Sequence, residues 1–508
     1  MFTDEHRYDV WDEIRQRGIR AFSDQITPEL VAEAAVATGV LLVKSPLCLF
    51  NLIWLGIAAA LHRTDDFETV LKGTLKVLKC DQNFATPALG RTKQKSKKAN
   101  SPQKKKSKHD PYRNDPADVT EEAFSQARSR MPLEFWFNLI ILLVGKFEKK
   151  HAELLQYKGF RLLAIDGTSI GLAHWKQLRH HFGASRNKNG NQKTEARMVM
   201  LQFPLTRIPY AYELCPWSEG ENTIARRLTK HLRANDLVLL DGCFWSYGLF
   251  LDIQQQGAFF ALPLKGRNVS LKRVGRTKGL DYQVIWTPKD SRGKWKKESL
   301  PKSIGLRVII YQLPGFRPQK LVTNLLDAQK ITREDWIRLA CDSSSKGKLE
   351  PGLMHRRWEI ETTYKELKVV QEMEGGLRSR TPKSLQFEVA GHVVLYLMVR
   401  WLIVEAAVKH GVDPLRISFT HALRELNHMR PMLIVASDSW ASHLINLLLE
   451  QIAEHQVPFR PGRSYPRRKK STNYKKEKTP ESDAKLSNNR LAKKSPQKKQ
   501  NKKNAIQA

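Results

Sequence analysis

The sequence predicts an α/β core with a β-rich insertion, preceded by an all-helical region. Apolar residues at helical spacing fill residues 1–90 and 117–155. From residue 156 onward, strand-like and helix-like segments alternate, which is typical of a sheet with crossover helices. Two segments, 91–116 and 457–508, are rich in Lys and poor in large apolar residues, so we expect both to be disordered.

The helical part begins with ordinary start signals. Pro28 precedes the apolar run ELVAEAAVATGVLL, Ser45-Pro46 precedes a second apolar run, and Thr120 and Pro132 precede two more. We therefore expect helices over 28–42, 48–62 and 66–78, one beginning at 120 and one beginning at 132.

The α/β part divides into a first core segment (156–256), a β-rich insertion (257–324) and a second core segment (325–456). Strands are expected at 161–170, 196–205, 208–215 and 236–242, with an amphipathic helix at 221–233. The insertion contains the β-like runs FFALPL, YQVIWT and LRVIIYQL. Two long helices, 355–372 and 382–410, are expected to follow.

The charge balance indicates a polyanionic partner. The chain has 508 residues with 86 Lys and Arg against 51 Asp and Glu, a net charge of +35. Residues 91–116 carry +8 and residues 460–508 carry +14. Nucleic acid is the first candidate and an anionic membrane the second. The most apolar run, 47–61, is too short to span a membrane. Attraction to DNA phosphates and simple solubility both remain open for the tail.

Cysteine usage fits a reducing compartment. The five cysteines are odd in number, widely spaced and never in a C-x-x-C pair, which argues against a disulfide framework or a zinc site. The first residues lack the pattern of a secretion signal. We expect a cytoplasmic protein.

Two predicted strands end in the same dipeptide. Asp166-Gly167 follows LLAI and Asp241-Gly242 follows LVLL. An acid at the carboxyl end of a buried strand is held rigidly and is still reachable by a ligand. The alternative is that each Asp simply begins a turn.

A third acid lies in the segment MHRRWEIETTYKELK, residues 354–368. On a helix, Arg357, Glu361, Tyr364 and Lys368 share one face. The alternative is an ordinary surface ion pair, which contributes only a few tenths of a kcal/mol. If Asp166 and Asp241 converged with Glu361, the three carboxylates could hold two Mg²⁺ ions for in-line phosphodiester chemistry.

These blocks, in this order, resemble the insertion-sequence-four (IS4-like) family of DDE transposases. The resemblance rests on LLAIDGTSI, RNKNGNQKTEARMVMLQFPL, VLLDGCFWSYGLF, LVTNLLDAQ and RRWEIETTYKELK. It implies an RNase H-like catalytic core, a catalytic and metal-binding triad of Asp166, Asp241 and Glu361, and two Mg²⁺ ions, with Mn²⁺ as an alternative. It also implies that residues 1–90 bind DNA.

The family signature around the third acid is Tyr-x2-Arg-x3-Glu-x6-Lys. Arg357, Glu361 and Lys368 match it, whereas Met354 occupies the Tyr position. In the family this block is linked to hairpin chemistry, so the loss of the Tyr leaves the hairpin route and another cleavage route as alternatives here. Arg357, Lys368 and Lys365 are the expected DNA contacts.

The family also uses an aromatic residue of the insertion to stack on an unstacked base. Trp286 and Trp295 are the candidates here, and a core position is the alternative for each.

The sequence therefore predicts a DNA transposase that cuts transposon ends and joins them to target DNA, acting as a homodimer on double-stranded DNA, in a bacterial cytoplasm and near the nucleoid. Two alternatives stay open. One is a catalytically silent or repurposed DNA-binding protein, and the other is a metal-dependent endonuclease on the same core.

Overall fold

The computed structural model describes residues 20–40, 47–62, 119–186, 192–264, 269–275, 279–288, 300–312, 318–339 and 350–458, with residues 68, 70, 71, 73 and 74. The predicted linker 91–116, the tail from residue 459 onward, most of the predicted helix 66–78 and Trp295 lie outside these residues.

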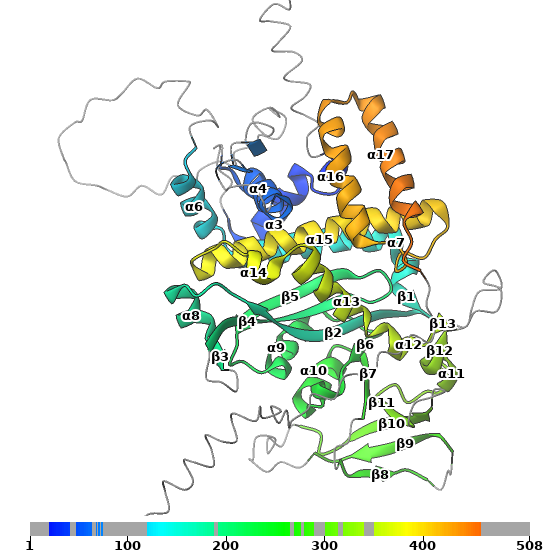
Figure 1. The fold of residues 1–508 in the computed structure, drawn as a ribbon. Coiled ribbons are helices and arrows are strands. Elements are labelled where there is room, and N and C mark those ends of the chain that lie inside the picture. The colour runs from blue at the N-terminus through cyan, green and yellow to red at the C-terminus, as the bar shows by residue number, and fades with distance from the viewer. Residues whose placement is uncertain are drawn as a thin grey trace, which may run out of the picture. The chain divides into compact units, whose positions relative to one another are not determined.

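The N-terminal part is helical, as the sequence predicts (Figure 1). Its helices are α2 (Arg20–Ser23), α3 (Pro28–Thr38), α4 (Leu49–Leu61), α6 (Glu121–Arg130) and α7 (Leu133–His151). Pro28 occupies the first turn of α3, and the Thr27 hydroxyl accepts a hydrogen bond from the Leu30 N–H. This helix ends at Thr38 rather than at residue 42 because Gly39 adopts a left-handed φ of 65°.

One eleven-stranded sheet runs through the described chain, and its strands β8 to β10 lie at the lower edge of the view in Figure 1. Its strands are β1 (Gln156–Tyr157), β2 (Phe160–Gly171), β3 (Ala184–Arg186), β4 (Gln192–Phe203), β5 (Ile208–Pro216), β6 (Asp236–Leu240), β7 (Phe259–Pro263), β8 (Leu271–Arg273), β9 (Asp281–Trp286), β10 (Ile304–Tyr311) and β11 (Gln319–Thr323). The order is β3-β4-β2-β6-β7-β11-β10-β9-β8, with β1 paired to β2 and β5 paired to β4. Strands β2, β6 and β7 are parallel neighbours. A separate pair consists of β12 (Arg338–Leu339) and β13 (Glu350–Pro351).

The predicted β-rich insertion does not form a sheet of its own. Strand β7 lies parallel to β6 within the core, and β11, β10, β9 and β8 extend the same sheet in antiparallel fashion. The β-like runs do form strands, as the sequence predicts, but their pairing with the core sheet is a long-range feature that local periodicity does not encode.

The sheet is buried on both faces. Leu163 and Ile165 of β2 belong to a large core that includes residues of α4, α7 and α15. Leu162 and Ala164 alternate with them and belong to a second, smaller core. This alternation follows from the two-residue period of a strand.

The remaining helices are α8 (Lys176–Phe182), α9 (Glu221–Leu228), α10 (Tyr247–Gln255), α11 (Arg333–Ile337), α12 (Leu353–Arg356), α13 (Glu359–Lys365), α14 (Met373–Gly376), α15 (Pro382–His410), α16 (Phe419–Val435) and α17 (Asp438–Glu454). Short 3-10 turns are η4 (Ala152–Leu155), η5 (Thr229–His231) and η6 (Gly242–Phe244), and η8 (Glu366–Val370) is a π-helix. The predicted helix 221–233 ends as a helix at Leu228 and continues as η5.

The predicted helix 355–372 is broken into α12, α13 and η8. In contrast, helix 382–410 is confirmed as the continuous α15. Among the described residues, α15 is the one helix long and apolar enough to cross a membrane, and its most apolar window is wholly buried within the fold. Its apolar character is therefore that of a core helix.

Candidate active site

Asp166 and Asp241 lie at adjacent places on two neighbouring strands. The last residues paired between β2 and β6 are Ile165 and Leu240, and the two acids come next. Parallel neighbours lie about 4.8 Å apart, so the two acids begin close together. The Asp-Gly pair was expected to end strand β2, but β2 continues past Asp166 to Gly171 by pairing with β4. Asp166 instead marks the point where β6 stops.

The third acid, Glu361, lies near Asp166 and Asp241, because all three pair with Arg357. Its Nη1 atom lies 3.9 Å from Asp166 Oδ2 and 3.7 Å from Glu361 Oε1, and its Nη2 atom lies 3.6 Å from Asp241 Oδ1. The Arg357 side chain is 4% exposed, both aspartates are 16% exposed and Glu361 is 46% exposed. Three carboxylates from separate segments therefore surround one buried guanidinium.

The environment of Asp166 disfavours its charged form. Burial raises the pKa of this carboxyl to about 6, the Gly167 N–H and Arg357 oppose the rise, and the charges of Glu361 and Asp241 add to it. The Gly167 N–H donates to Asp166 Oδ1 at 2.9 Å. The Asp241 side chain caps η6, accepting from the Cys243 N–H at 3.4 Å.

The segment that carries Arg357 and Glu361 is attached to both faces of the sheet. Met354 of α12 is buried in the smaller core, and Ile360 of α13 is buried in the larger one. The chain therefore crosses from one face to the other between these residues. Tyr364 fixes α13 further, because its hydroxyl donates to the Asp166 main-chain carbonyl at 2.7 Å.

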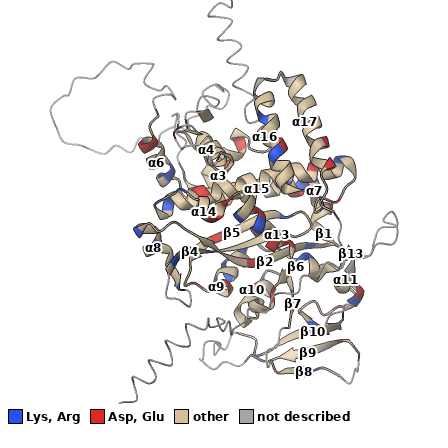
Figure 2. Ribbon diagram, viewed as in Figure 1, with Lys and Arg blue, Asp and Glu red and all other residues tan. Residues whose placement is uncertain are grey.

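A buried charge network holds the other face of this segment; Figure 2 colours the Lys and Arg positions blue and the Asp and Glu positions red along the ribbon. Arg207, in the β4–β5 turn, donates to Glu359 Oε2 at 2.8 and 2.6 Å and to Glu366 Oε1 at 3.2 Å. On its other side, Glu366 accepts from Arg400 and, at 2.7 Å, from the Tyr396 hydroxyl. Burial opposes ionisation of Glu366, but the two arginines outweigh it and lower its pKa. As the helical stripe predicts, Glu359 and Glu366 face away from Glu361.

The predicted DNA-contact residues have different surroundings. Lys365 is exposed at the end of α13. Lys368 lies in η8, with its Nζ atom 3.6 Å from Glu374 Oε2. Trp286 is 7% exposed and packs edge-on against Trp245 with ring centroids 5.0 Å apart, so its faces are not open to a base in this structure.

The sequence does not predict the contacts that three further residues make at this site. Trp358 is 41% exposed and lies under the Arg357 guanidinium, 4.5 Å from ring centroid to Cζ. Tyr364 falls on the predicted stripe, but its bond to the Asp166 carbonyl depends on packing between two distant segments. Met354, at the family Tyr position, is 6% exposed and does not present its side chain to solvent.

The donor chemistry of the three acids fits a hard divalent cation, which prefers carboxylate oxygens. Within the described residues, however, no three His, Cys, Asp or Glu side chains are arranged to hold a metal ion. The acids face Arg357, whose Nη1 atom has no hydrogen-bond partner among the described atoms. Metal binding would therefore require these side chains to turn away from the guanidinium.

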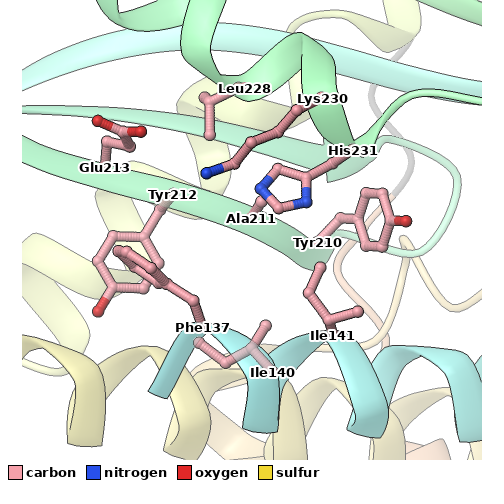
Figure 3. Close-up of a pocket in the computed structure, with 10 residues that line it drawn as sticks. All are labelled: Phe137, Ile140, Ile141, Tyr210, Ala211, Tyr212, Glu213, Leu228, Lys230 and His231. Atoms are coloured by element: carbon pink, nitrogen blue, oxygen red, sulfur yellow. The ribbon is translucent and has the colours of Figure 1, made fainter. Parts of the chain in front are cut away.

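A small cavity elsewhere is not a competing site (Figure 3). It lies between α7, β5 and the end of α9, where side chains such as Phe137, Tyr212 and His231 point into it. Its volume of about 10 Å³ has room for a single water molecule.

Comparison with known proteins matches residues 157–398 to the family model of the transposase DDE domain. No curated protein matches the chain. A solved structure, the cryo-EM piggyBac transposase synaptic complex with hairpin DNA, matches with 12% identity over 69% of each chain and a TM-score of 0.33, a likeness too slight to argue from. The family match supports a DDE transposase, and it spans Asp166, Asp241, Arg357 and Glu361.

Proposed function

We propose that the chain is a DNA transposase of the IS4-like type that cuts the ends of a mobile element and joins them to target DNA. The observation that carries the proposal is the meeting of Asp166, Asp241 and Glu361 around Arg357, inside the segment similar to the transposase DDE domain. The strand order β5-β4-β2-β6-β7, with β2, β6 and β7 parallel, supports an RNase H-like core.

In this proposal, water attacks a phosphodiester at the element end, and the bond from phosphorus to the 3′ oxygen breaks. The freed 3′-OH then attacks a phosphodiester of target DNA, so that a new bond forms from its oxygen to the target phosphorus while the bond from that phosphorus to the 3′ oxygen of the target strand breaks and leaves a 3′-OH on the target. Asp166, Asp241 and Glu361 would hold two Mg²⁺ ions, which when bound stabilise charge on the attacking and leaving oxygens. The pairing of β2 with β6 fixes the main chain just before Asp166 and Asp241, and so holds these two residues next to each other.

Arg357 has a separate task in this proposal. A guanidinium binds phosphate oxygens through parallel N–H donors, and Nη1 of Arg357 has no hydrogen-bond partner among the described atoms. We assign Arg357 to the scissile phosphate, and Lys365 and Lys368 to neighbouring backbone phosphates. Double-stranded DNA is the partner, bound by a homodimer that brings two ends together.

Single substitutions at the three acids test the proposal. Asp166→Asn, Asp241→Asn and Glu361→Gln should each abolish Mg²⁺-dependent cleavage of a labelled duplex made from the DNA that flanks the coding region. Asp252→Asn is the matched control, because Asp252 on α10 pairs with Arg226 on α9 and takes no part in the triad. Cleavage retained by any of the three variants would refute the mechanism.

A second assay separates transposition from the two alternatives. A transposase should join pre-cut labelled ends to a target plasmid, whereas an endonuclease should cut without joining. A silent DNA-binding protein should bind the duplex but neither cut nor join it. The silent alternative is included because all three acids pair with Arg357, as acids with a purely structural role would.

A further inference from the structure

Two lysines from different elements share one carboxylate at the far end of β2, the strand that carries Asp166. Lys193 Nζ, at the start of β4, lies 3.1 Å from Glu374 Oε1. Lys368 Nζ, in η8, lies 3.6 Å from Glu374 Oε2. Each oxygen of the carboxylate therefore faces a different ammonium group, which is the arrangement that two oxygens of a phosphate would make.

This cluster lies directly over β2. A Cβ atom built on Gly171 would come within 2.7 Å of Lys193 Cε and 3.3 Å of Glu374 Oε1, so glycine makes room for both side chains. Gly171 follows Asp166 by five residues on the same strand, a span of about 17 Å at about 3.3 Å per residue. A DNA strand leaving the three acids along β2 would pass over this point.

The acid is held on an irregular segment. Glu374 itself has a non-helical backbone, and its neighbours Glu372 and Gly375 have φ values of 50° and 87°. Because the side chains of Glu374 and Lys193 are 41% and 52% exposed, their ion pair is weak and open to competition by another anion. Lys193 also lies 3.3 Å from Glu195 Oε1, a contact that would keep its ammonium oriented after Glu374 leaves.

We propose that Lys193 and Lys368 bind one backbone phosphate of DNA, and that Glu374 occupies this phosphate site in the DNA-free protein. The proposal rests on the proposed function and deepens it, because it adds Lys193 to the DNA-binding residues and gives Glu374 the role of a displaceable anion. Without Glu374, two ammonium groups would repel each other across an empty site.

The test measures DNA binding by the full-length protein without divalent metal, using fluorescence anisotropy over a salt series and the duplex made from the flanking DNA. Glu374→Gln should tighten binding about two- to five-fold at low salt, as expected for loss of a weak competing ion pair. Lys193→Ala and Lys368→Ala should each weaken binding and reduce the slope of log K against log salt by about 0.9.

The matched control is Glu334→Gln. It removes an equally charged, exposed carboxylate whose partner Arg333 lies 3.6 Å away on α11. If Glu374→Gln tightens binding no more than this control does, the tighter binding comes only from the change in the protein's net charge, and the proposal is wrong. In a Lys193→Ala, Lys368→Ala background the gain from Glu374→Gln should disappear, and a gain that persists also overturns the proposal.

The outcomes separate this inference from the proposed function. If the wild-type protein fails to cut and join DNA but the lysine variants lose salt dependence as expected, the phosphate site stands and the transposase proposal falls. If the wild-type protein cuts and joins DNA while Lys193→Ala binds like wild type, the phosphate site falls alone.

Discussion

Tyr364 connects the third acid to the first at the level of single atoms. It lies one turn after Glu361 on α13, it is buried, and its hydroxyl donates to the main-chain carbonyl of Asp166 at 2.7 Å. The bond therefore ties the position of the helix to the strand on which Asp166 sits.

Tyr364→Phe should lower the free energy of unfolding by about 1–3 kcal/mol, because it leaves a part-buried carbonyl without this donor. It should also slow DNA cleavage while leaving DNA affinity unchanged. Urea unfolding and single-turnover cleavage measure the two effects.

Tyr247→Phe is the control for this prediction, since Tyr247 also donates to a main-chain carbonyl, that of Pro301. It should lose stability without a comparable loss of cleavage. Equal loss of cleavage in both variants would mean that Tyr364 acts only through stability.

At the scale of elements, the network around Glu366 fixes α13 and η8 against the sheet and α15. Its carboxylate lies between Arg207, which is 11% exposed, and Arg400, which is fully buried. Glu366→Gln should cost about 3–5 kcal/mol of stability, because it leaves the buried Arg400 guanidinium without its counter-charge, whereas Arg207 keeps its pairing with Glu359. Thermal and urea unfolding measure this loss.

Glu334→Gln, at an exposed ion pair, should change stability by less than about 0.5 kcal/mol. A loss at Glu366 as small as that at Glu334 would show that the network does not hold the segment.

The contact between α4 and α15 depends on two glycines. A Cβ atom built on Gly391 would lie 2.5 Å from the Gly56 carbonyl oxygen, which is main chain and cannot rotate away. Gly391→Ala should therefore lower stability by about 1–3 kcal/mol through overpacking. Gly145→Ala on α7, where a Cβ would meet no described atom within 4 Å, should instead raise stability by up to about 1 kcal/mol. Urea unfolding measures both changes in the free energy of unfolding. If both substitutions raised it, or both lowered it, this explanation of the contact between α4 and α15 would be contradicted.

At the scale of the whole molecule, α7 and α15 are joined by an ion pair that responds to acid. Glu405 accepts hydrogen bonds from Lys150 at 2.6 Å and from Trp401 at 2.9 Å, and it lies 3.0 Å from His151 Nε2. Burial opposes its ionisation, but these contacts outweigh burial and lower its pKa to about 2.

A lowered pKa in the folded state stabilises the protein above the unfolded pKa, near 4.3, and this stability is lost as pH falls toward 2. Glu405→Gln should therefore be less stable than wild type at neutral pH, and the difference should shrink between about pH 4.3 and 2. Urea unfolding across this range measures it. Glu153→Gln, at an exposed position, should show no such convergence. A constant difference for Glu405→Gln would contradict the assignment.

The sequence by itself determined the kinds of elements and the places of two acids. Apolar periodicity predicted α3, α4, α7 and α15 and the strands β2, β4, β5 and β6, because each pattern is local and repeats within one element. The two Asp-Gly pairs after apolar runs were visible for the same reason. Net charge predicted the type of partner without reference to fold.

Tertiary structure alone decided how these parts meet. The extension of the core sheet by β8 to β11, the burial of Trp286, the central position of Arg357 and the sharing of Glu374 by two lysines all join residues far apart along the chain. Such contacts depend on register and packing between elements, which no local pattern encodes. The break near the start of the predicted helix 355–372 has the same cause, since Met354, just before it, packs into the smaller core and Ile360, within it, packs into the larger one.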